Sequence, residues 1–366
     1  MAEQRPRAPR TPVTLITGFL GSGKTTLLNS ALCDPCMSGA LVIINEFGEV
    51  GLDHVLVASS SDSIVVLENG CLCCTVFGDL VGTLNKLYHR REAGEIAPFD
   101  RVLIETSGVA DPTSIVQAFL SDPTLQGLYA MSGVVTVVDA INYRATLENH
   151  DEATRQIALA DHIVVTKLDM ASPSDRPTLE QEVRSALRGI NHRAVVLDAD
   201  GAALDLARLL RWGGHDPSRG SAEAKLWLAE GDAGVCGDCG HDEDSMGRRH
   251  LHGHSHLQIG SLSFVRDEPL PRLALQLLLE AIERNLGSRL LRIKAIVTVT
   301  GEEYGPAVIQ GAQHLLHNIV WLDHWPFADR KSRFVLIAAG IGTEHLREMV
   351  SLLDRISSRS AAARPA

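Results

Sequence analysis

Short apolar runs alternate with amphipathic segments between about residues 12 and 211. Continuous apolar runs are typical of strands buried on both faces, and the segments between them space their apolar residues as helices do. Strands that alternate with helices predict a parallel sheet covered by helices on both faces, which is an α/β fold. The expected strands are 11–17, 40–45, 63–68, 100–105, 133–139, 162–167 and 194–198.

The pattern changes after residue 211. Glycine, aspartate and histidine are frequent as far as residue 257 and no periodicity is visible, which indicates a linker or an inserted loop. Apolar runs and amphipathic helices then return and indicate a smaller α+β domain. Its expected strands are 257–266, 290–299, 317–325 and 332–340, and its expected helices are 269–286 and 343–356. The expected organisation is a disordered tail at 1–11, an α/β domain at 12–211, a flexible linker at 212–257, an α+β domain at 258–356 and a disordered tail at 357–366.

The composition is that of an ordinary globular protein. Of the 366 residues 45% are hydrophobic and 22% are charged, which excludes disorder as the dominant state and suits two or three domains. A net charge of −11 makes nucleic acid and anionic membranes poor candidates as partners. No apolar run is long enough to span a bilayer and no secretory signal is visible, so we expect a cytoplasmic protein.

The seven cysteines lie in clusters rather than singly. In a reducing compartment such clusters favour metal binding over disulfides. The clusters are Cys33 and Cys36, then Cys71, Cys73 and Cys74, then Cys236 and Cys239.

Residues 18–25 read GFLGSGKT, which fits the phosphate-loop pattern G-x-x-x-x-G-K-[ST]. The motif follows an expected strand and opens an expected helix, which is the context it needs. Glycines turn backbone N–H groups toward phosphate oxygens, and the helix N-terminus favours the negative charge. The alternative is a glycine-rich turn that binds nothing. The expected nucleotide contacts here are Gly18, Gly21, Ser22, Gly23, Lys24, Thr25 and Thr26.

A second motif concerns the base. Residues 166–169 read TKLD and follow an expected strand, and they are similar to the N-K-x-D element of GTPases. The carboxylate of Asp169 would accept hydrogen bonds that guanine can donate and adenine cannot, which favours GTP over ATP. The stem of Lys167 would pack across the base. Thr166 replaces the usual asparagine, so one supporting contact differs, and Asp169 as a simple helix cap is the alternative.

An acidic residue also ends the strand at 100–105. Glu105 followed three residues later by Gly108 resembles the D-x-x-G element, in which the carboxylate serves the Mg²⁺ shell and the glycine N–H contacts the γ-phosphate. We expect Thr25 and Glu105 to hold Mg²⁺, and Lys24, Glu105 and Gly108 to act in catalysis. Asp139, at the end of another strand, is a weaker candidate for the same shell.

Residues 68–74 read ENGCLCC. Cys71, Cys73 and Cys74 can converge on one ion only in a turn, because neighbouring strand residues point to opposite faces, and Gly70 permits a turn. Three thiolates leave one position of a tetrahedral Zn²⁺ site for a carboxylate, a water or a partner. Such a site can release its ion. The alternative is three reduced cysteines that pack as small apolar side chains.

The ordered motifs resemble the CobW family of G3E-type P-loop GTPases, which includes zinc-regulated GTPase metalloprotein activators. These proteins are metallochaperones related to the nickel-insertion GTPases of urease and hydrogenase maturation. The motifs are TGFLGSGKTTLL, NEFGEVGLD, ENGCLCC, ETSGVADP, VVDA and TKLD, with LLRIKAIV and VWLDHWP in the smaller domain. The resemblance implies a P-loop NTPase domain followed by a CobW C-terminal domain.

The resemblance also implies roles for individual residues. Glu46 and Glu49 lie in a segment that resembles the switch of the family, and they would place carboxylates near the nucleotide or the metal. Cys71, Cys73 and Cys74 match the motif that transfers metal. The remaining matches are Lys24 and Thr25 in the phosphate loop, Glu105 and Gly108 in the acidic switch, and Lys167 and Asp169 in the base-reading element.

A histidine-rich stretch lies at 236–256 within the expected linker. Imidazole and thiolate suit Zn, Co, Ni and Cu, so the stretch could load metal before it reaches the three cysteines, and a solvated linker is the alternative. For Cys33 and Cys36 we favour no metal or redox role. The expected auxiliary ligands are Cys236, Cys239, His241, His250, His252, His254 and His256.

Together these motifs predict a GTP-dependent metallochaperone that uses GTP, Mg²⁺ and Zn²⁺, with Co²⁺ as the alternative ion. The partner would be a client apo-metalloprotein that docks on the C-terminal domain, and a homo-oligomer is compatible with the sequence. A cobalt or iron insertion factor for cobalamin synthesis or nitrile hydratase shares every motif. A non-catalytic metal store or sensor is the alternative from another class.

Overall fold

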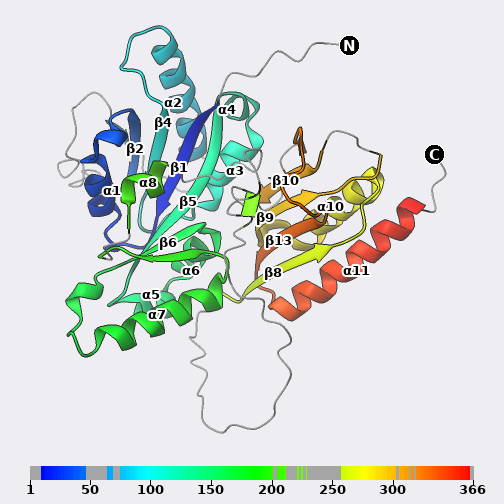
Figure 1. The fold of residues 1–366 in the computed structure, drawn as a ribbon. Helices are drawn as coiled ribbons and strands as arrows, with labels where there is room; N and C mark the ends of the chain where they lie inside the picture. The colour runs from blue at the N-terminus through cyan, green and yellow to red at the C-terminus, as the bar shows by residue number, and fades with distance from the viewer. Residues whose placement is uncertain are drawn as a thin grey trace.

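The computed structural model shows two sheets, each covered by helices (Figure 1). No helix in the described part of the chain is long and apolar enough to cross a membrane. The structure describes residues 10–46, 64–68, 75–200, 204–211, 257–301, 305–312, 315–316 and 319–362, with isolated positions between 221 and 228.

The first sheet is parallel throughout, as the alternation of strands and helices predicts. Its strands lie in the order β3-β2-β4-β1-β5-β6-β7, and every neighbouring pair is parallel. The strands are β1 (Thr11–Thr17), β2 (Ala40–Glu46), β3 (Ile64–Glu68), β4 (Arg101–Thr106), β5 (Tyr129–Asp139), β6 (His162–Thr166) and β7 (Val195–Asp198).

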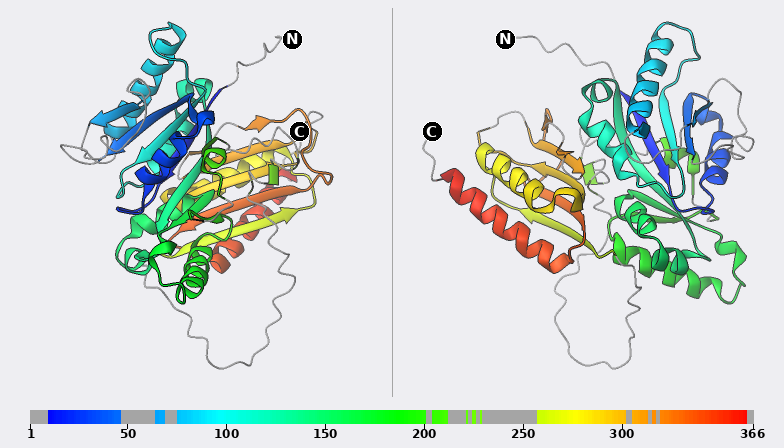
Figure 2. Two further views of the ribbon diagram at one scale, coloured as in Figure 1. Left: turned by 60° about the vertical axis from the view of Figure 1, so that its left-hand side comes forward. Right: turned by 180° about the vertical axis from the view of Figure 1, so that it is seen from behind.

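Helices cover both faces of this sheet (Figure 2). Val13 and Leu15 of β1 join an apolar cluster with α2 and α3, whereas Ile16 joins a cluster with α1 and α8 on the other face. This alternation along β1 is the reason that its apolar run is continuous. The helices are α1 (Lys24–Leu32), α2 (Thr75–Glu92), α3 (Thr113–Ser121), α4 (Pro123–Leu128), α5 (Tyr143–Asn149), α6 (Asp151–Leu159), α7 (Arg176–Ile190) and α8 (Leu206–Arg211).

Strand β1 lies at the point where the chain reverses its direction of travel across the sheet. From β1 the chain crosses to β2 and β3 on one side of it, and it later returns to β5 on the other side. In open parallel sheets, ligands bind beyond the carboxyl ends of the strands at such a point. The loop that follows Thr17 therefore occupies the usual ligand position of this fold.

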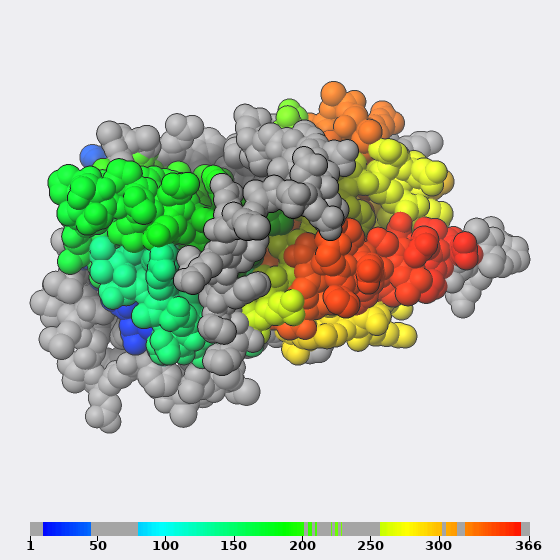
Figure 3. Space-filling view, turned by 90° about the horizontal axis from the view of Figure 1, so that it is seen from below, coloured from blue at the N-terminus to red at the C-terminus, as the bar shows by residue number. Residues whose placement is uncertain are grey.

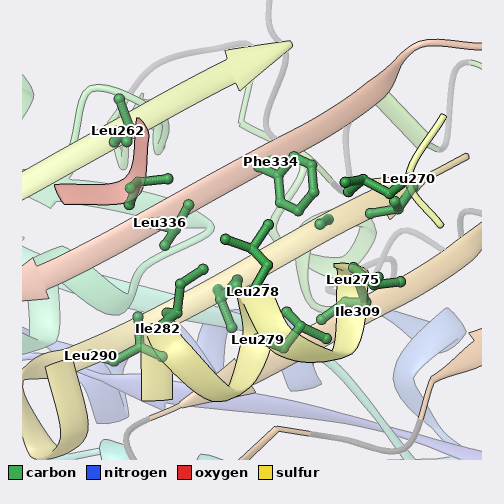
Figure 4. Close-up of a cluster of buried hydrophobic side chains, with 14 of the residues drawn as sticks. Leu262, Leu270, Leu275, Leu278, Leu279, Ile282, Leu290, Ile309, Phe334 and Leu336 are labelled. Atoms are coloured by element: carbon green, nitrogen blue, oxygen red, sulfur yellow. The ribbon is translucent and has the colours of Figure 1, made fainter. Parts of the chain in front are cut away.

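The second sheet is antiparallel along its main path, in the order β11-β10-β9-β13-β8. Helices α10 (Arg272–Leu286) and α11 (Thr343–Ala362) bury one of its faces. Figure 4 shows Leu278 of α10 close to Phe334 of β13 in this core. The strands are β8 (Ile259–Arg266), β9 (Leu290–Val297), β10 (Ala307–Ala312), β11 (Leu315–Leu316), β12 (Val320–Trp321) and β13 (Ser332–Ala339).

Three details of this domain differ from the expectation. Strand β10 has no counterpart among the expected strands, because its sequence AVIQGA is short and contains residues of low strand propensity. In the described part of the strand expected at 317–325, only Val320–Trp321 forms a strand, which pairs with β10. Helix α11 continues to Ala362, beyond the expected boundary at 356.

The other face of the antiparallel sheet packs against the parallel-sheet domain. Ala158 and Leu159 of α6 share a buried apolar cluster with Leu291, Ile337 and Ala339 of the C-terminal domain. Helix α11 lies on the side away from this contact (Figure 1) and forms a ridge on the surface of the domain (red in Figure 3). The C-terminal sheet is thus covered on one face by its own helices, and its other face packs partly on α6 and partly on Ala224, Leu228, Leu322 and Phe327.

A largely buried carboxylate adds a polar contact to this interface. Asp161, which follows α6, accepts a hydrogen bond from Arg292 Nη2 at 2.9 Å and one from Lys294 Nζ at 2.8 Å. It also accepts a bond from the backbone N–H of Val134 at 2.9 Å. Burial alone would raise the pKa of Asp161, but the two cations hold that pKa well below its usual range. The carboxylate is therefore ionised at neutral pH and joins the two domains.

Candidate functional site

The loop between β1 and α1 has the backbone geometry of a phosphate cradle. Gly18, Gly21 and Gly23 adopt φ values of 141°, 70° and 95°, a region that side chains other than glycine rarely enter. At Gly18 a Cβ atom would also lie 2.2 Å from the carbonyl oxygen of Val137, so only glycine fits there. Left-handed glycines within such a turn let backbone N–H groups point inward, which is the arrangement that binds phosphate.

The side chains at the start of α1 lie where the motif predicts them. Lys24 is buried, and its Nζ donates to the carbonyl oxygens of Gly18 at 3.0 Å and Phe19 at 3.3 Å. Thr25 Oγ1 donates to Glu105 Oε1 at 2.7 Å, so a hydroxyl from α1 meets a carboxylate from the end of β4. Hydroxyl and carboxylate oxygens are ligands that Mg²⁺ prefers, so this pair fits such an ion. Thr26 is exposed on α1.

The segment after β4 touches the phosphate loop at Gly108. A Cβ atom there would lie 2.6 Å from the backbone N of Leu20 and 2.7 Å from its Cα. Beneath this contact Thr106 Oγ1 donates to Thr17 Oγ1 at 2.8 Å, which links the ends of β4 and β1. A movement of residues 107–110 would therefore also displace the phosphate loop.

The base-reading motif is attached to the phosphate loop by two side chains. Thr166 Oγ1 donates to the carbonyl oxygen of Ser22 at 2.8 Å, and Lys167 Nζ donates to that of Gly21 at 2.7 Å. Lys167 has φ 63°, a left-handed conformation rare outside glycine. Asp169 is exposed. Threonine at position 166 thus still reaches the phosphate loop.

Asp139 orients Lys167. Its Oδ2 accepts from Lys167 Nζ and from Asn142 Nδ2, each at 2.8 Å, and its Oδ1 accepts from the backbone N–H groups of Ile141 and Asn142. Partial burial raises the pKa of Asp139, but these hydrogen bonds outweigh it and lower the pKa below the usual value. Both oxygens are engaged in the turn after β5, which supports a positioning role over the Mg²⁺ shell.

Replacement of Thr166 by valine should weaken GTP and GDP binding by about fivefold each. Valine keeps the shape but removes a hydroxyl donor whose hydrogen bond is worth about 1 kcal/mol. Isothermal titration with each nucleotide measures the change. Thr166→Asn is the matched variant and should retain wild-type affinity, because its amide can donate to the same carbonyl. Wild-type affinity in Thr166→Val would show that this contact does not support the nucleotide site.

A cavity of about 200 Å³ separates the phosphate loop from the end of β5 and from α5 and α6. Phe19 lines it and stacks on His150, with ring centroids 4.3 Å apart. Gln156 of α6 also lines it. The phosphate loop borders this cavity, and the hydrogen bonds from Thr166 and Lys167 hold the loop beside it. Sequence motifs gave no sign of His150 or Gln156, since a lone histidine or helical glutamine carries no pattern.

Most of the expected metal ligands lie outside the described residues. Glu46 ends β2, where it pairs in register with Glu68 of β3, but its side chain is not described. Within the described ranges no group of three or more His, Cys, Asp or Glu side chains could hold a metal ion. Cys33 and Cys36 are described, and both are exposed near the end of α1 without a disulfide. The expected ligands outside the described residues are Glu49, Cys71, Cys73, Cys74, Cys236, Cys239, His241, His250, His252, His254 and His256.

Comparison with known proteins assigns both parts of the chain. Residues 12–197 match the nucleotide-binding domain of CobW/HypB/UreG, and residues 259–352 match the C-terminal domain of the cobalamin synthesis protein CobW. The zinc chaperone YjiA of Escherichia coli is 30% identical over 335 residues, which cover 92% of this chain and 96% of YjiA. The crystal structure of zinc-bound YjiA GTPase superimposes with a TM-score of 0.64 at 26% identity, and covers 94% of this chain and 99% of that one.

Other relatives match over part of their length. The zinc-regulated GTPase metalloprotein activator 1 of Schizosaccharomyces pombe is 34% identical over 201 residues, which cover 53% of this chain and 47% of the relative. The zinc chaperone CobW of Pseudomonas aeruginosa is 38% identical over 202 residues, which cover 52% of this chain and 51% of the relative. Two matching domains and a relative aligned along nearly its whole length place this chain in the CobW/HypB/UreG family of P-loop GTPases, with the CobW C-terminal domain.

Proposed function

We propose that this protein is a GTP-dependent zinc chaperone that binds Zn²⁺ at Cys71, Cys73 and Cys74 and passes it to a client apo-metalloprotein when GTP is hydrolysed. One observation carries the proposal. The strand that leads to the cysteines ends at the same edge of the sheet as the phosphate loop. The names of the zinc chaperone relatives support zinc as the cargo.

The register of the sheet allows the distance between the cysteine segment and the nucleotide site to be estimated. Glu68 of β3 pairs with Glu46 of β2, and Asn45 of β2 pairs with Thr106 of β4. Parallel neighbours lie about 4.8 Å apart, so the last described residue before the cysteines lies about 10 Å from the strand that carries Glu105. A change at the γ-phosphate can reach a cysteine site across that distance through the ends of two strands.

On the nucleotide side, the glycine loop holds the phosphates and Lys24 contacts the β- and γ-phosphates. Thr25 and Glu105 would hold Mg²⁺, which neutralises charge on the phosphates when bound. Asp169 reads the guanine edge while Lys167, oriented by Asp139, covers the base. A water attacks the γ-phosphorus, the bond to the bridging oxygen breaks, and GDP and phosphate leave. Gly108 then loses its contact with the γ-phosphate, and the segment at 107–110 relaxes.

On the metal side, the thiolates of the three cysteines bind Zn²⁺ and leave a fourth position for Glu46, Glu49 or a ligand from the client. In the GTP state the site binds zinc tightly. Relaxation of the segment at 107–110 after hydrolysis lowers zinc affinity, so the ion moves to the client. Cys236, Cys239 and the five histidines from His241 to His256 supply ions to the transfer site.

The proposal is tested by titrating Zn²⁺ against a competing chelator with Mg²⁺–GDP or with Mg²⁺ and a non-hydrolysable GTP analogue. Zinc should bind at least about tenfold tighter in the GTP state, and by linkage zinc should tighten the GTP analogue by the same factor. A parallel Co²⁺ titration separates zinc from cobalt as cargo. Equal zinc affinity in both nucleotide states would contradict the proposal and favour a store or sensor.

A further inference from the structure

Helix α6 touches both the segment after β4 and the C-terminal domain. Gln156 lies in its middle, and its last turn leads directly to Asp161. The two ends of this path are far apart in the sequence, since Gln156 contacts Gly108 while Asp161 contacts Arg292. The proposed function uses neither Gln156 nor Asp161.

At the first end, a single side chain holds two carbonyl groups. Gln156 Nε2 donates to the carbonyl oxygen of Gly108 at 3.2 Å and to that of Ala110 at 3.0 Å. Gln156 is 1% exposed, so water does not compete for these bonds. Its neighbour Arg155 pairs with Asp111 at 3.2 Å. Two adjacent residues of α6 thus bind residues 108–111, the segment that contacts the γ-phosphate in the proposed cycle.

At the second end, side chains of the C-terminal domain bind the end of the helix. Arg292 Nη1 donates to the carbonyl oxygen of Leu159 at 2.7 Å, and its Nη2 donates to Asp161 at 2.9 Å. Lys294 Nζ reaches the other oxygen of Asp161 at 2.8 Å. Both cations come from strand β9, which lies in the middle of its sheet. The C-terminal domain therefore binds the backbone carbonyl group of Leu159, at the end of α6, and the carboxylate of Asp161 two residues later.

The path between the contacts of Gln156 and those of Leu159 and Asp161 is short and mostly helical. Leu159 lies three positions after Gln156 in α6, and a helix rises about 1.5 Å per residue, so these two contacts lie about 4.5 Å apart along the helix axis. Thr136 Oγ1 donates to the carbonyl oxygen of Gln156 at 2.8 Å, which holds the helix against β5. Because this helix is held against β5, a displacement of Gly108 would be transmitted through it to Arg292.

We propose that α6 couples the nucleotide state to the seating of the C-terminal domain, with Gln156 as the positioning residue at the nucleotide end and Asp161 as the anchor at the domain end. When the segment at 107–110 moves, Gln156 moves α6, and the fit of β9 on Leu159 and Asp161 changes. The reverse also holds, so a client that binds the C-terminal domain alters the preference for GTP over GDP. This inference rests on the nucleotide part of the proposed function and not on zinc.

A double-mutant cycle on the full-length protein tests the coupling. The affinity for a non-hydrolysable GTP analogue is divided by the affinity for GDP in wild type, Gln156→Met, Asp161→Asn and the double variant. Asp161→Asn should change this ratio about fivefold, the low end of measured allosteric couplings. In the Gln156→Met background the same substitution should leave the ratio unchanged within about 1.5-fold, because the link to the nucleotide is already cut.

Controls keep the result specific. Arg347→Met removes an exposed ion pair with Glu344 on α11 and should leave the ratio unchanged. If Asp161→Asn does not unfold cooperatively, Arg292→Lys replaces it, since lysine keeps the charge but cannot bond Leu159 and Asp161 together. Equal effects of Asp161→Asn with and without Gln156, or no effect at all, would overturn the coupling. Failure of every variant and the wild type to bind nucleotide would instead overturn the proposed function.

Discussion

Replacement of Cys73 by serine should lower zinc affinity at least about 100-fold and leave GTP and GDP binding unchanged. Serine stays protonated at neutral pH and is a poor ligand, whereas a zinc-bound cysteine is a thiolate. Loss of a residue that merely supports a metal ligand already costs about 10- to 100-fold, so loss of a ligand should cost more. Competition titration with a chromophoric chelator measures the affinity, and isothermal titration measures nucleotide binding.

Cys33→Ser is the matched control, because Cys33 is an exposed, free cysteine near the end of α1. It should leave zinc affinity unchanged. Zinc held by the auxiliary ligands from Cys236 to His256 would survive Cys73→Ser, so the tight site must be counted separately from any weaker one. Unchanged affinity at the tight site in Cys73→Ser would place the zinc elsewhere and remove the central element of the proposed function.

The second large effect is expected at Gly108. An alanine Cβ would lie 2.6 Å from the backbone N of Leu20, so one of the two segments must move by about 1 Å to reach ordinary contact. A misplacement of that size can cost about 100-fold in rate. Gly108→Ala should therefore hydrolyse GTP at least about 100-fold more slowly, as measured by phosphate release under saturating GTP.

Gly82→Ala provides the control for the same chemical change. Gly82 lies in α2 with no atom within 4 Å of the position of a Cβ. Alanine there should leave hydrolysis unchanged and stabilise the fold by about 0.5–1 kcal/mol, because a helical glycine is replaced. Wild-type hydrolysis by Gly108→Ala would mean that the contact with Leu20 is not needed for turnover.

The parallel sheet could be predicted because its strands are buried on both faces and appear as continuous apolar runs. The phosphate loop could be predicted because glycine spacing reports backbone conformation directly, as the positive φ values of Gly18, Gly21 and Gly23 show. Thr25 and Glu105 were expected to lie together, and the structure places their oxygens 2.7 Å apart. Their role with Mg²⁺ stays a prediction.

Contacts between distant residues that belong to no motif could not be predicted. Asp161 and Lys294 are separated by 133 positions, and neither belongs to a motif. Gln156 is one glutamine in an amphipathic helix, and only the fold shows that it faces two carbonyl groups. The position of Lys167 depends on Asp139, which the sequence presented as a candidate for the Mg²⁺ shell. Strand β10 was missed because sheet neighbours, and not its own residues, stabilise it.

The C-terminal sheet is covered on both faces, since its own helices cover one side and α6, together with Ala224, Leu228 and Phe327, packs on the other. A fragment that begins near residue 257 would expose Leu291, Ile337 and Ala339 to water. As bait in a search for clients, such a fragment would capture proteins through an apolar surface that the intact chain conceals. The full-length protein, held in one defined nucleotide state, is therefore the appropriate bait for identifying its clients.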